Sequence, residues 1–369
     1  STTAISGTGT TALNIGSVTD TGSVTFSAAN TYVGTTSVSK GTLIVTNVSG
    51  LGTTDAGTTI ASAATLDLQN LILGAEALTI NGGTLATSTG TSSFSGAISL
   101  GASGSTFSVA GTQLTLSGII SGGYGFTKTG SGTLILSGGN SYTGGTTISA
   151  GTLKADNAAA LGPTIGAGAV SVTSGAVLDL NGQSLTNSGT LTIRGTGIGA
   201  GGALINSSAT AASYSGLIAL GAASSIVGDT GTIALTNVGT ITGATYALTL
   251  GGAQGGSVAS IIGTTSGTVT KAGAGTWTLS GANTYTGATT VSAGTLAITN
   301  ATGLGTTAGG TTIASGATLD LQGVIVGAEA VTINGGTLVT STGTSSLSGA
   351  ISLGASGSTV SVSGTQLTL

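Results

Sequence analysis

Several residue types that build catalytic and metal sites are missing from this chain. Among its 369 residues it has no histidine, no cysteine and no methionine, and only one proline. Without histidine there is no Ser-His-Asp triad and no imidazole metal ligand, and without cysteine there is no thiolate nucleophile, disulfide, zinc ribbon or iron–sulfur cluster. The composition therefore predicts no catalytic, cofactor-binding or metal-binding residues, and no cofactor.

Charge is almost as scarce. Charged side chains make up 4% of the sequence, and five Lys and Arg against nine Asp and Glu give a net charge of −4. Nucleic-acid binding needs a basic surface, so nucleic acid is not expected as a partner. No apolar run has the length of a membrane-spanning helix and no signal peptide is recognisable, so we expect no transmembrane segment in this chain.

Glycine and small side chains dominate what is present. The chain has 70 glycines, yet 39% of its residues are hydrophobic and its mean hydropathy is +0.52. Disordered linkers have low hydrophobicity. The chain must therefore fold and bury its apolar groups.

The sequence repeats itself with a period of 253 residues. Residues 45–116 match residues 298–369, and about four in five positions are identical. We predict one continuous domain over 1–369, with repeat modules at approximately 1–44, 45–153, 154–296 and 297–369. Modules 45–153 and 154–296 together form the long repeat. Both chain ends fall inside this repeating pattern, so we expect the chain to be an excerpt of a longer molecule.

Short strands are predicted throughout. Apolar and polar residues alternate over about three to six positions and then meet glycine, asparagine or aspartate, as at residues 77–83 and 111–116. Self-similarity over a long chain favours a solenoid over a sandwich or a propeller. We therefore predict an all-β fold, a parallel β-helix (β-solenoid) uncapped at both ends. At roughly 20 residues per coil it would have about 18 coils and a length of some 85 Å.

A shorter block occurs three times. The copies read SVTFSAANTYVGTTSVSKGTL from Ser23, GTLILSGGNSYTGGTTISAGTL from Gly132 and GTWTLSGANTYTGATTVSAGTL from Gly275. The tyrosines of successive copies lie 110 and 143 residues apart, which together make the same 253. Two unequal modules therefore form one higher-order repeat.

These copies carry a family resemblance. The pattern G-x-G-T-L-x-L-S-G-x-N-x-Y-T-G-x-T-x-x-x-A-G-T-L runs over residues 130–153 and again over 273–296, where Trp277 replaces the first leucine. The block resembles the autotransporter-associated β-strand repeat, also called the passenger-associated transport repeat. The first copy departs from the pattern at Val33 and at Lys40, which replaces the small residue before the last Gly-Thr-Leu. The resemblance implies a secreted or surface-attached bacterial β-helical passenger, many of which are adhesive.

Acidic residues recur at matching positions. Asp67, Asp179 and Asp320 share a Leu-Asp-Leu context, and Glu76 and Glu329 share a Gly-Ala-Glu-Ala context. Equivalent acids are 112 or more residues apart in the sequence, which separates them by at least about five coils, or more than about 20 Å. One calcium ion or one glycosidic bond cannot span that distance. We interpret these acids as exposed solubilising charges or turn caps.

Three lysines are also singled out by the repeats. Lys128 and Lys271 occupy equivalent positions just before the short block, and Lys40 interrupts its first copy. A sparse charge on a neutral strand surface commonly guards against unwanted edge pairing. We interpret all three as such guards.

The aromatic residues of the block could stack on sugar rings. Tyr32, Tyr142, Tyr285 and Trp277 occur once per module beside asparagine and glycine. That placement favours a packed corner or coil-closing position.

Two other patterns have simple interpretations. The Asn-x-Ser/Thr sequons at Asn47, Asn206 and Asn300 are expected by chance in a chain rich in serine and threonine. The glycine pairs at 138–139 and 201–202 precede no helix, so they are predicted to be turns and not phosphate loops.

The leading functional hypothesis is an extracellular structural rod, either an adhesin stalk or the repeating body of a surface fibre or biofilm filament. Its partners would be further repeats or copies of itself, joined end to end or laterally, or surface glycans. The alternative is binding of carbohydrate or ice through flat Ser/Thr faces, although the Thr-x-Thr triplets at Thr190, Thr268 and Thr276 are not one coil apart. A carbohydrate-active enzyme is less favoured because it needs clustered charges. We predict a protein without enzymatic activity.

Overall fold

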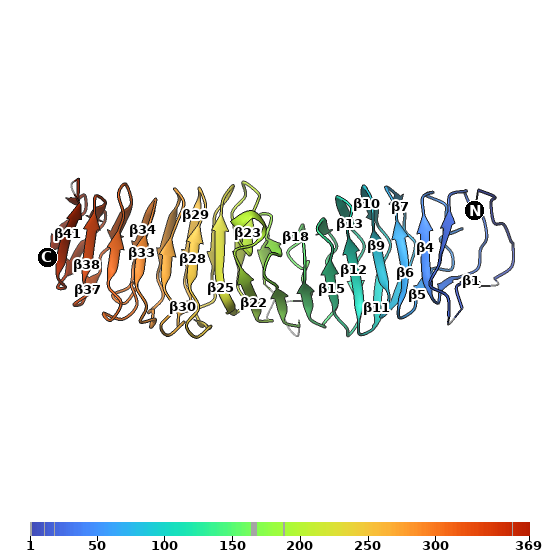
Figure 1. The fold of residues 1–369 in the computed structure, drawn as a ribbon, viewed down its shortest axis with the longest axis horizontal. Helices are drawn as coiled ribbons and strands as arrows, with labels where there is room; N and C mark the ends of the chain where they lie inside the picture. The colour runs from blue at the N-terminus through green and yellow to red at the C-terminus, as the bar shows by residue number, and fades with distance from the viewer. Residues whose placement is uncertain (1, 11, 18, 164–167, 187–188, 356) are drawn as a thin grey trace. The chain divides into compact units, whose positions relative to one another are not determined.

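The fold is a parallel β-solenoid of about 17 turns, as predicted. The computed structural model describes residues 2–369 except 11, 18, 164–167, 187–188 and 356. It contains two compact units, one formed by Ser1–Leu178 with Thr186–Gly189 and the other by Asp179–Leu185 with Thr190–Leu369. Within each unit, strands from successive turns pair in parallel and lie side by side (Figure 1).

The strands of the first part of the chain are short. They are β1 (Leu13–Ile15), β2 (Ser23–Phe26), β3 (Thr36–Val38), β4 (Gly41–Val45), β5 (Thr58–Ile60), β6 (Ala64–Leu68), β7 (Ile72–Leu73), β8 (Leu78–Asn81), β9 (Thr84–Thr87), β10 (Thr91–Phe94), β11 (Ile98–Ala102), β12 (Ser105–Val109), β13 (Gln113–Leu116), β14 (Ile120–Ser121), β15 (Phe126–Thr129), β16 (Thr133–Leu136), β17 (Thr146–Ile148), β18 (Thr152–Ala155), β19 (Val170–Val172) and β20 (Val177–Asp179).

The remaining strands are also short, except β25, which has 11 residues, and one 3-10 turn, η1, lies among them. They are β21 (Ser184–Leu185), β22 (Leu191–Gly195), η1 (Ile198–Ala200), β23 (Leu204–Asn206), β24 (Ala212–Tyr214), β25 (Ile218–Gly228), β26 (Ile233–Leu235), β27 (Thr240–Ile241), β28 (Leu248–Gly251), β29 (Gly255–Val258), β30 (Ile261–Ile262), β31 (Val269–Lys271), β32 (Thr276–Leu279), β33 (Thr289–Val291), β34 (Thr295–Ile298), β35 (Thr311–Ile313), β36 (Thr318–Leu321), β37 (Ile325–Val326), β38 (Val331–Asn334), β39 (Thr337–Thr340), β40 (Thr344–Leu347), β41 (Ile351–Ala355), β42 (Thr359–Val362) and β43 (Gln366–Thr368).

Stacking of the turns builds the core from aligned apolar side chains. Leu43, Leu66, Leu85 and Phe107 are register partners in β4, β6, β9 and β12, and each is fully buried. Side chains alternate between the two faces of a strand, so the residues between them point outward. Paired residues are 19 positions apart between β16 and β18 and 29 apart between β21 and β24. The predicted coil of roughly 20 residues is therefore a minimum that insertions enlarge.

Two buried threonines are natural tests of this packing. The Oγ1 atoms of Thr87 and Thr340, at matching positions of the long repeat, are buried without a hydrogen-bond partner in the described residues. Valine has nearly the same shape and removes the unpaired hydroxyl. We expect Thr87→Val to raise the free energy of unfolding by about 1 kcal/mol, measured by urea denaturation. Thr84→Val, on the half-buried outer face of the same strand, is the control, and equal effects of the two substitutions would contradict the assignment.

The ends of the solenoid are not decided by this fold. The expectation of uncapped ends stays a prediction, and at the N-terminus Ser1 lies outside the described residues. The continuity of residues 1–369 as one domain also stays a prediction.

Candidate functional site

The aspartates of the repeats link neighbouring turns. Asp67 accepts hydrogen bonds from the backbone N–H of Ser88 at 2.9 Å and from the Ser88 hydroxyl at 2.6 Å, and Gln69 donates to it at 2.8 Å. Asp320 has the same set of partners in Ser341 and Gln322. Each carboxylate thus accepts from a serine one turn farther along the chain.

Asp179 adopts the same arrangement with a different spacing. It accepts from the backbone and hydroxyl of Ser207 and from the backbone N–H of Asn181. All three aspartates are at most 6% exposed. The interpretation as exposed solubilising charges is therefore wrong, and the alternative of turn capping describes what these carboxylates do.

The glutamates are buried in a different environment. Glu76 accepts a hydrogen bond from the Thr58 hydroxyl at 2.8 Å, and Glu329 accepts from the Thr311 hydroxyl at 2.7 Å. Both are at most 3% exposed, so they too are not exposed charges. Asp67 and Glu76 have separate partners, and no group of three acidic side chains that could hold a metal occurs in the described part of the chain.

Burial changes the ionisation of these glutamates. Burial raises the pKa of Glu76 and Glu329 above the ordinary 4.5, and the threonine hydrogen bond opposes the shift in part. The folded chain then keeps protons that the unfolded chain has lost. The contribution of each glutamate to stability is therefore complete below pH 4.5 and is lost as the pH rises through the folded pKa.

We expect the Glu76→Gln, Glu329→Gln variant to have a flatter dependence of unfolding free energy on pH above about pH 4.5. Glutamine keeps the acceptor for the threonine hydroxyl and cannot ionise. The measurement is a series of urea denaturation curves in the acid-to-neutral range. The exposed Asp55→Asn variant should keep the parental slope. An unchanged slope in the glutamine variant would contradict the role of the buried carboxyls.

The lysines before the short block lie inside the solenoid. Lys128 and Lys271 are fully buried. The Nζ of Lys128 donates to the carbonyls of Thr129, Gly130 and Ala150 at 2.8–3.0 Å. Burial lowers the pKa of each lysine to about 8, so both remain largely charged at neutral pH with all three donors. Their interpretation as surface guards against edge pairing is wrong.

Lys271 repeats this geometry, with carbonyls of Ala272, Gly273 and Ala293 as acceptors. Gly130 and Gly273 have φ of 76° and 72°, a conformation that favours glycine and turns the chain after the strand. Lys40 is half-buried and not an interior lysine. Its interpretation as a guard against edge pairing stays a prediction. The lysine ammonium group therefore donates hydrogen bonds to backbone carbonyls at the turn that the glycine makes.

The aromatic residues are packed inside, as predicted. Tyr142, Tyr285 and Trp277 are fully buried and Tyr32 is 5% exposed. The tyrosine hydroxyls share hydrogen bonds with threonines four residues later, and the indole of Trp277 donates to the carbonyl of Gly251. None of them offers an open ring face to a sugar.

The asparagine of the short block has a structural role that sequence reasoning did not assign. Asn140 accepts from the backbone N–H of Ile120, 20 residues earlier, and donates to the carbonyl of Ala160, 20 residues later. Asn30 and Asn283 make the equivalent pair of bonds. The side chain thus joins three successive turns, and its exact recurrence beside tyrosine was the available signal.

The sequons are also part of the stacking. Asn206 is fully buried and donates to the carbonyls of Thr210 and Thr232. The amides of Asn47 and Asn300 donate to carbonyls 20 residues earlier. The glycine pairs at 138–139 and 201–202 lie outside strands and helices, in agreement with turns.

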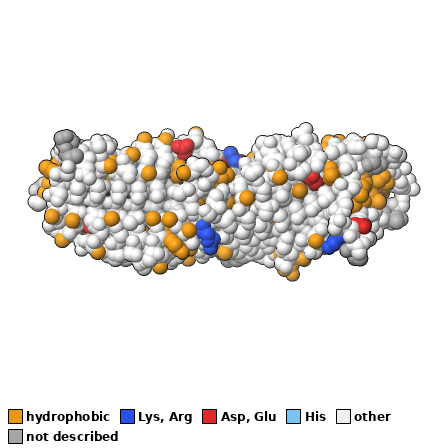
Figure 2. Space-filling model, viewed as in Figure 1, with side chains coloured by type: hydrophobic (Ala, Val, Ile, Leu, Met, Phe, Trp, Pro, Cys, Tyr) orange, Lys and Arg blue, Asp and Glu red, His pale blue; other side chains and the backbone are white. Residues whose placement is uncertain are grey.

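Outward threonines form columns with one residue per turn. In the first unit the register partners are Thr42, Thr65, Thr84, Thr106, Thr127, Thr147 and Ser171. In the second unit they are Ser225, Thr249, Thr270, Thr290, Thr312, Thr332 and Ser352. Threonines at turn spacing build these columns, and one of them, Thr270, also belongs to the triplet that begins at Thr268. On the face drawn in Figure 2, charged side chains are isolated among neutral ones.

The short block matches a known family of repeats. A family model described as passenger-associated transport repeat matches residues 18–45, 126–155 and 269–298. The adhesin BmaC autotransporter of Brucella suis biovar 1 (strain 1330) is 41% identical over 132 residues, which cover 35% of this chain and 4% of that protein. The chain therefore corresponds to a small part of this relative's length. No solved structure matches the chain.

The matched segments contain the features described above. Each includes the buried tyrosine and the asparagine that joins three turns, and the second and third also include the interior lysine. In the described residues, no helix is long and apolar enough to cross a membrane. Three segments of this β-solenoid therefore match the passenger-associated transport repeat.

Proposed function

We propose that this chain is a structural segment of an extracellular bacterial passenger, a rod that holds adhesive or anchoring regions away from the cell surface, and that it has no enzymatic activity. One observation carries the proposal: buried polar side chains form hydrogen bonds between one turn and the next. Asp67, Asn140 and Lys128 all do so. A repeat protein stacked in this way extends in one direction as turns are added.

The relative supports a surface location and an adhesive context, because it is named an adhesin and an autotransporter. Further repeats or copies of the chain, joined end to end or laterally, and surface glycans are the partners we propose.

The experiment is an insertion that keeps the register. A second copy of residues 45–297 is placed after residue 297, since residue 45 is equivalent to residue 298. Electron microscopy of the full chain should show a rod, and the insertion should lengthen it by about 55 Å, the rise of some 12 turns. A compact globule, or a particle of unchanged length, would reject the proposal.

The threonine columns favour a second candidate, binding of an extended regular surface such as ice or a neutral polysaccharide. Register partners on neighbouring strands are about 4.8 Å apart, so hydroxyl groups recur at that spacing. Thr270, Thr290 and Thr312 are central members of one column. Thermal hysteresis that is lost when these three become valine would support the ice version, and no hysteresis in the parent chain would eliminate it.

A further inference from the structure

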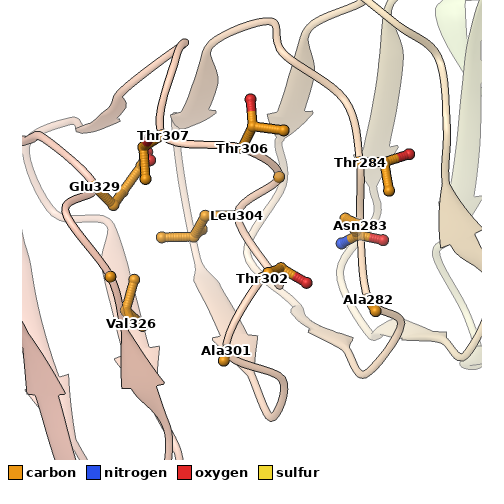
Figure 3. A pocket seen from close by; sticks show the side chains of 12 residues that line it. Ala282, Asn283, Thr284, Ala301, Thr302, Leu304, Thr306, Thr307, Val326 and Glu329 are labelled. Carbon is orange, nitrogen blue, oxygen red and sulfur yellow. The ribbon is translucent and has the colours of Figure 1, made fainter.

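A hollow of about 460 Å³ opens in the second unit where the loops of three successive turns meet (Figure 3). Its lining includes Leu304, Val326 and Glu329, none more than 3% exposed. Exposed threonines, among them Thr284, Thr302 and Thr306, lie around them. The hollow has the size of a small-molecule site, with an apolar floor and a few polar groups.

The buried carboxyl group is the unusual part of this lining. Glu329 is 2% exposed, and only one of its oxygens, Oε1, has a hydrogen-bond partner in the described residues, the Thr311 hydroxyl. The second oxygen is left without a partner. This oxygen keeps contact with solvent, since the buried atoms without a partner in the described residues do not include it, and so it can accept a hydroxyl of a ligand in the hollow.

The chemistry of the lining excludes two ligand classes. No lysine or arginine lines the hollow, so an anion would meet Glu329 without any compensating charge. A divalent cation needs several oxygen ligands. Glu329 is the only acid in the lining, and the amide oxygen of Asn283 already accepts the backbone N–H of Ile262.

We propose that this hollow binds a single unit of a neutral sugar. The apolar side chains of Leu304 and Val326 pack against the C–H face of the ring. The free oxygen of Glu329 accepts a sugar hydroxyl, and the threonine hydroxyls at the rim bond to others. This site goes beyond the proposed structural role, because a rod forms whether or not the hollow is occupied.

The first copy of the long repeat has larger side chains at two positions of this lining, and placing them in the second copy reduces the space in the hollow. Val48 and Leu73 stand where the second copy has Ala301 and Val326, and Glu76 stands where it has Glu329. The Ala301→Val, Val326→Leu variant therefore introduces side chains that the same fold already carries at these positions. Glu329→Gln keeps the acceptor for Thr311 and replaces the free carboxyl oxygen by an amide.

The test is saturation-transfer NMR on the full chain with glucose, galactose and N-acetylglucosamine as separate probes. We expect saturation transfer to at least one of them, loss of the signal in the filled variant, and about tenfold weaker binding in Glu329→Gln. Glu76→Gln, at the matching position of the first copy, should bind like the parent. N-acetylneuraminic acid, which is anionic, should show no transfer.

A circular dichroism spectrum like that of the parent and a cooperative thermal unfolding transition in each variant establish that the fold is kept. Saturation transfer that survives filling of the hollow, or no transfer to any of the three neutral sugars, would overturn the proposal. A change of self-association on filling, without sugar binding, would identify a protein side chain as the occupant and would also overturn it.

Discussion

Gly96→Ala is expected to lower the free energy of unfolding of the first unit by about 4 kcal/mol or more. Gly96 is buried at a corner where successive turns touch, and a Cβ atom there would overlap the carbonyl oxygen of Glu76 in the turn before. The three nearest atoms are all backbone atoms of Glu76, so no flexible side chain could move aside. The two turns would have to separate, which breaks the parallel pairing beside them.

The same contact recurs in the next two turns. Gly118 lies against the carbonyl of Gly96, and Gly138 against that of Gly118. Gly74→Ala is the matched control, because a Cβ atom at Gly74 meets nothing within 4 Å. We expect it to change the unfolding free energy by less than about 0.5 kcal/mol. Urea denaturation followed by circular dichroism measures both, and equal effects of the two alanines would contradict close stacking at the corner.

Lys128→Met is expected to destabilise the first unit by about 3 kcal/mol. Methionine fits the apolar ladder, in which Lys128 lies between Phe107 and Ile148, but it leaves three carbonyls without their donor. In the first copy, Ile15 pairs with Val38 as Lys271 pairs with Val291, so an apolar side chain is compatible with this ladder position. The expected loss of stability therefore measures the contribution of the missing hydrogen bonds.

Lys154→Met is the control, because Lys154 is only half-buried on the outer face of β18. A surface guard and an interior donor also differ in their response to pH. Since the folded pKa of Lys128 is about 8 and the ordinary value is 10.5, the unfolded chain holds more protons between them, and stability rises with pH over this interval. The methionine variant should lose this rise. A loss of unfolding free energy no larger than that of Lys154→Met would contradict the role of Lys128 as an interior hydrogen-bond donor.

The repeats made the fold predictable because every turn has apolar side chains at similar positions that must be buried. Leu66 and Leu85 can be buried only if like residues of neighbouring turns align, and a parallel solenoid provides that alignment. The family pattern also located the buried tyrosines and Trp277. These features depend on local sequence and on periodicity, which one sequence displays in full.

The roles of the charged residues could not be predicted in the same way. Asp67 has its serine partner 21 residues away and Asp179 has its partner 28 residues away. Turn length varies, so the partner is known only when the register of both turns is known. Lys128 was interpreted as a surface guard because a sparse charge on a neutral strand surface commonly prevents unwanted edge pairing. The carbonyls that bind it come from turns whose direction depends on glycine conformation.

Successive turns stack in parallel register, so that side chains one turn apart meet. The chain has no cysteine, so introduced pairs can be interpreted without interference. Thr127 and Thr147 are register partners on the outer face of β15 and β17. Partners in this position fall within disulfide range. Ser149 lies two residues beyond Thr147 and is displaced by about 7 Å along the strand, too far for a bridge to Thr127.

The most direct measurement is oxidation of the Thr127→Cys, Thr147→Cys chain beside the Thr127→Cys, Ser149→Cys chain, with the bridges identified by mass spectrometry. The stacked solenoid predicts an intramolecular disulfide in the first chain and free thiols in the second. Bridging of both at similar rates, or of the second alone, would contradict the register and with it the solenoid.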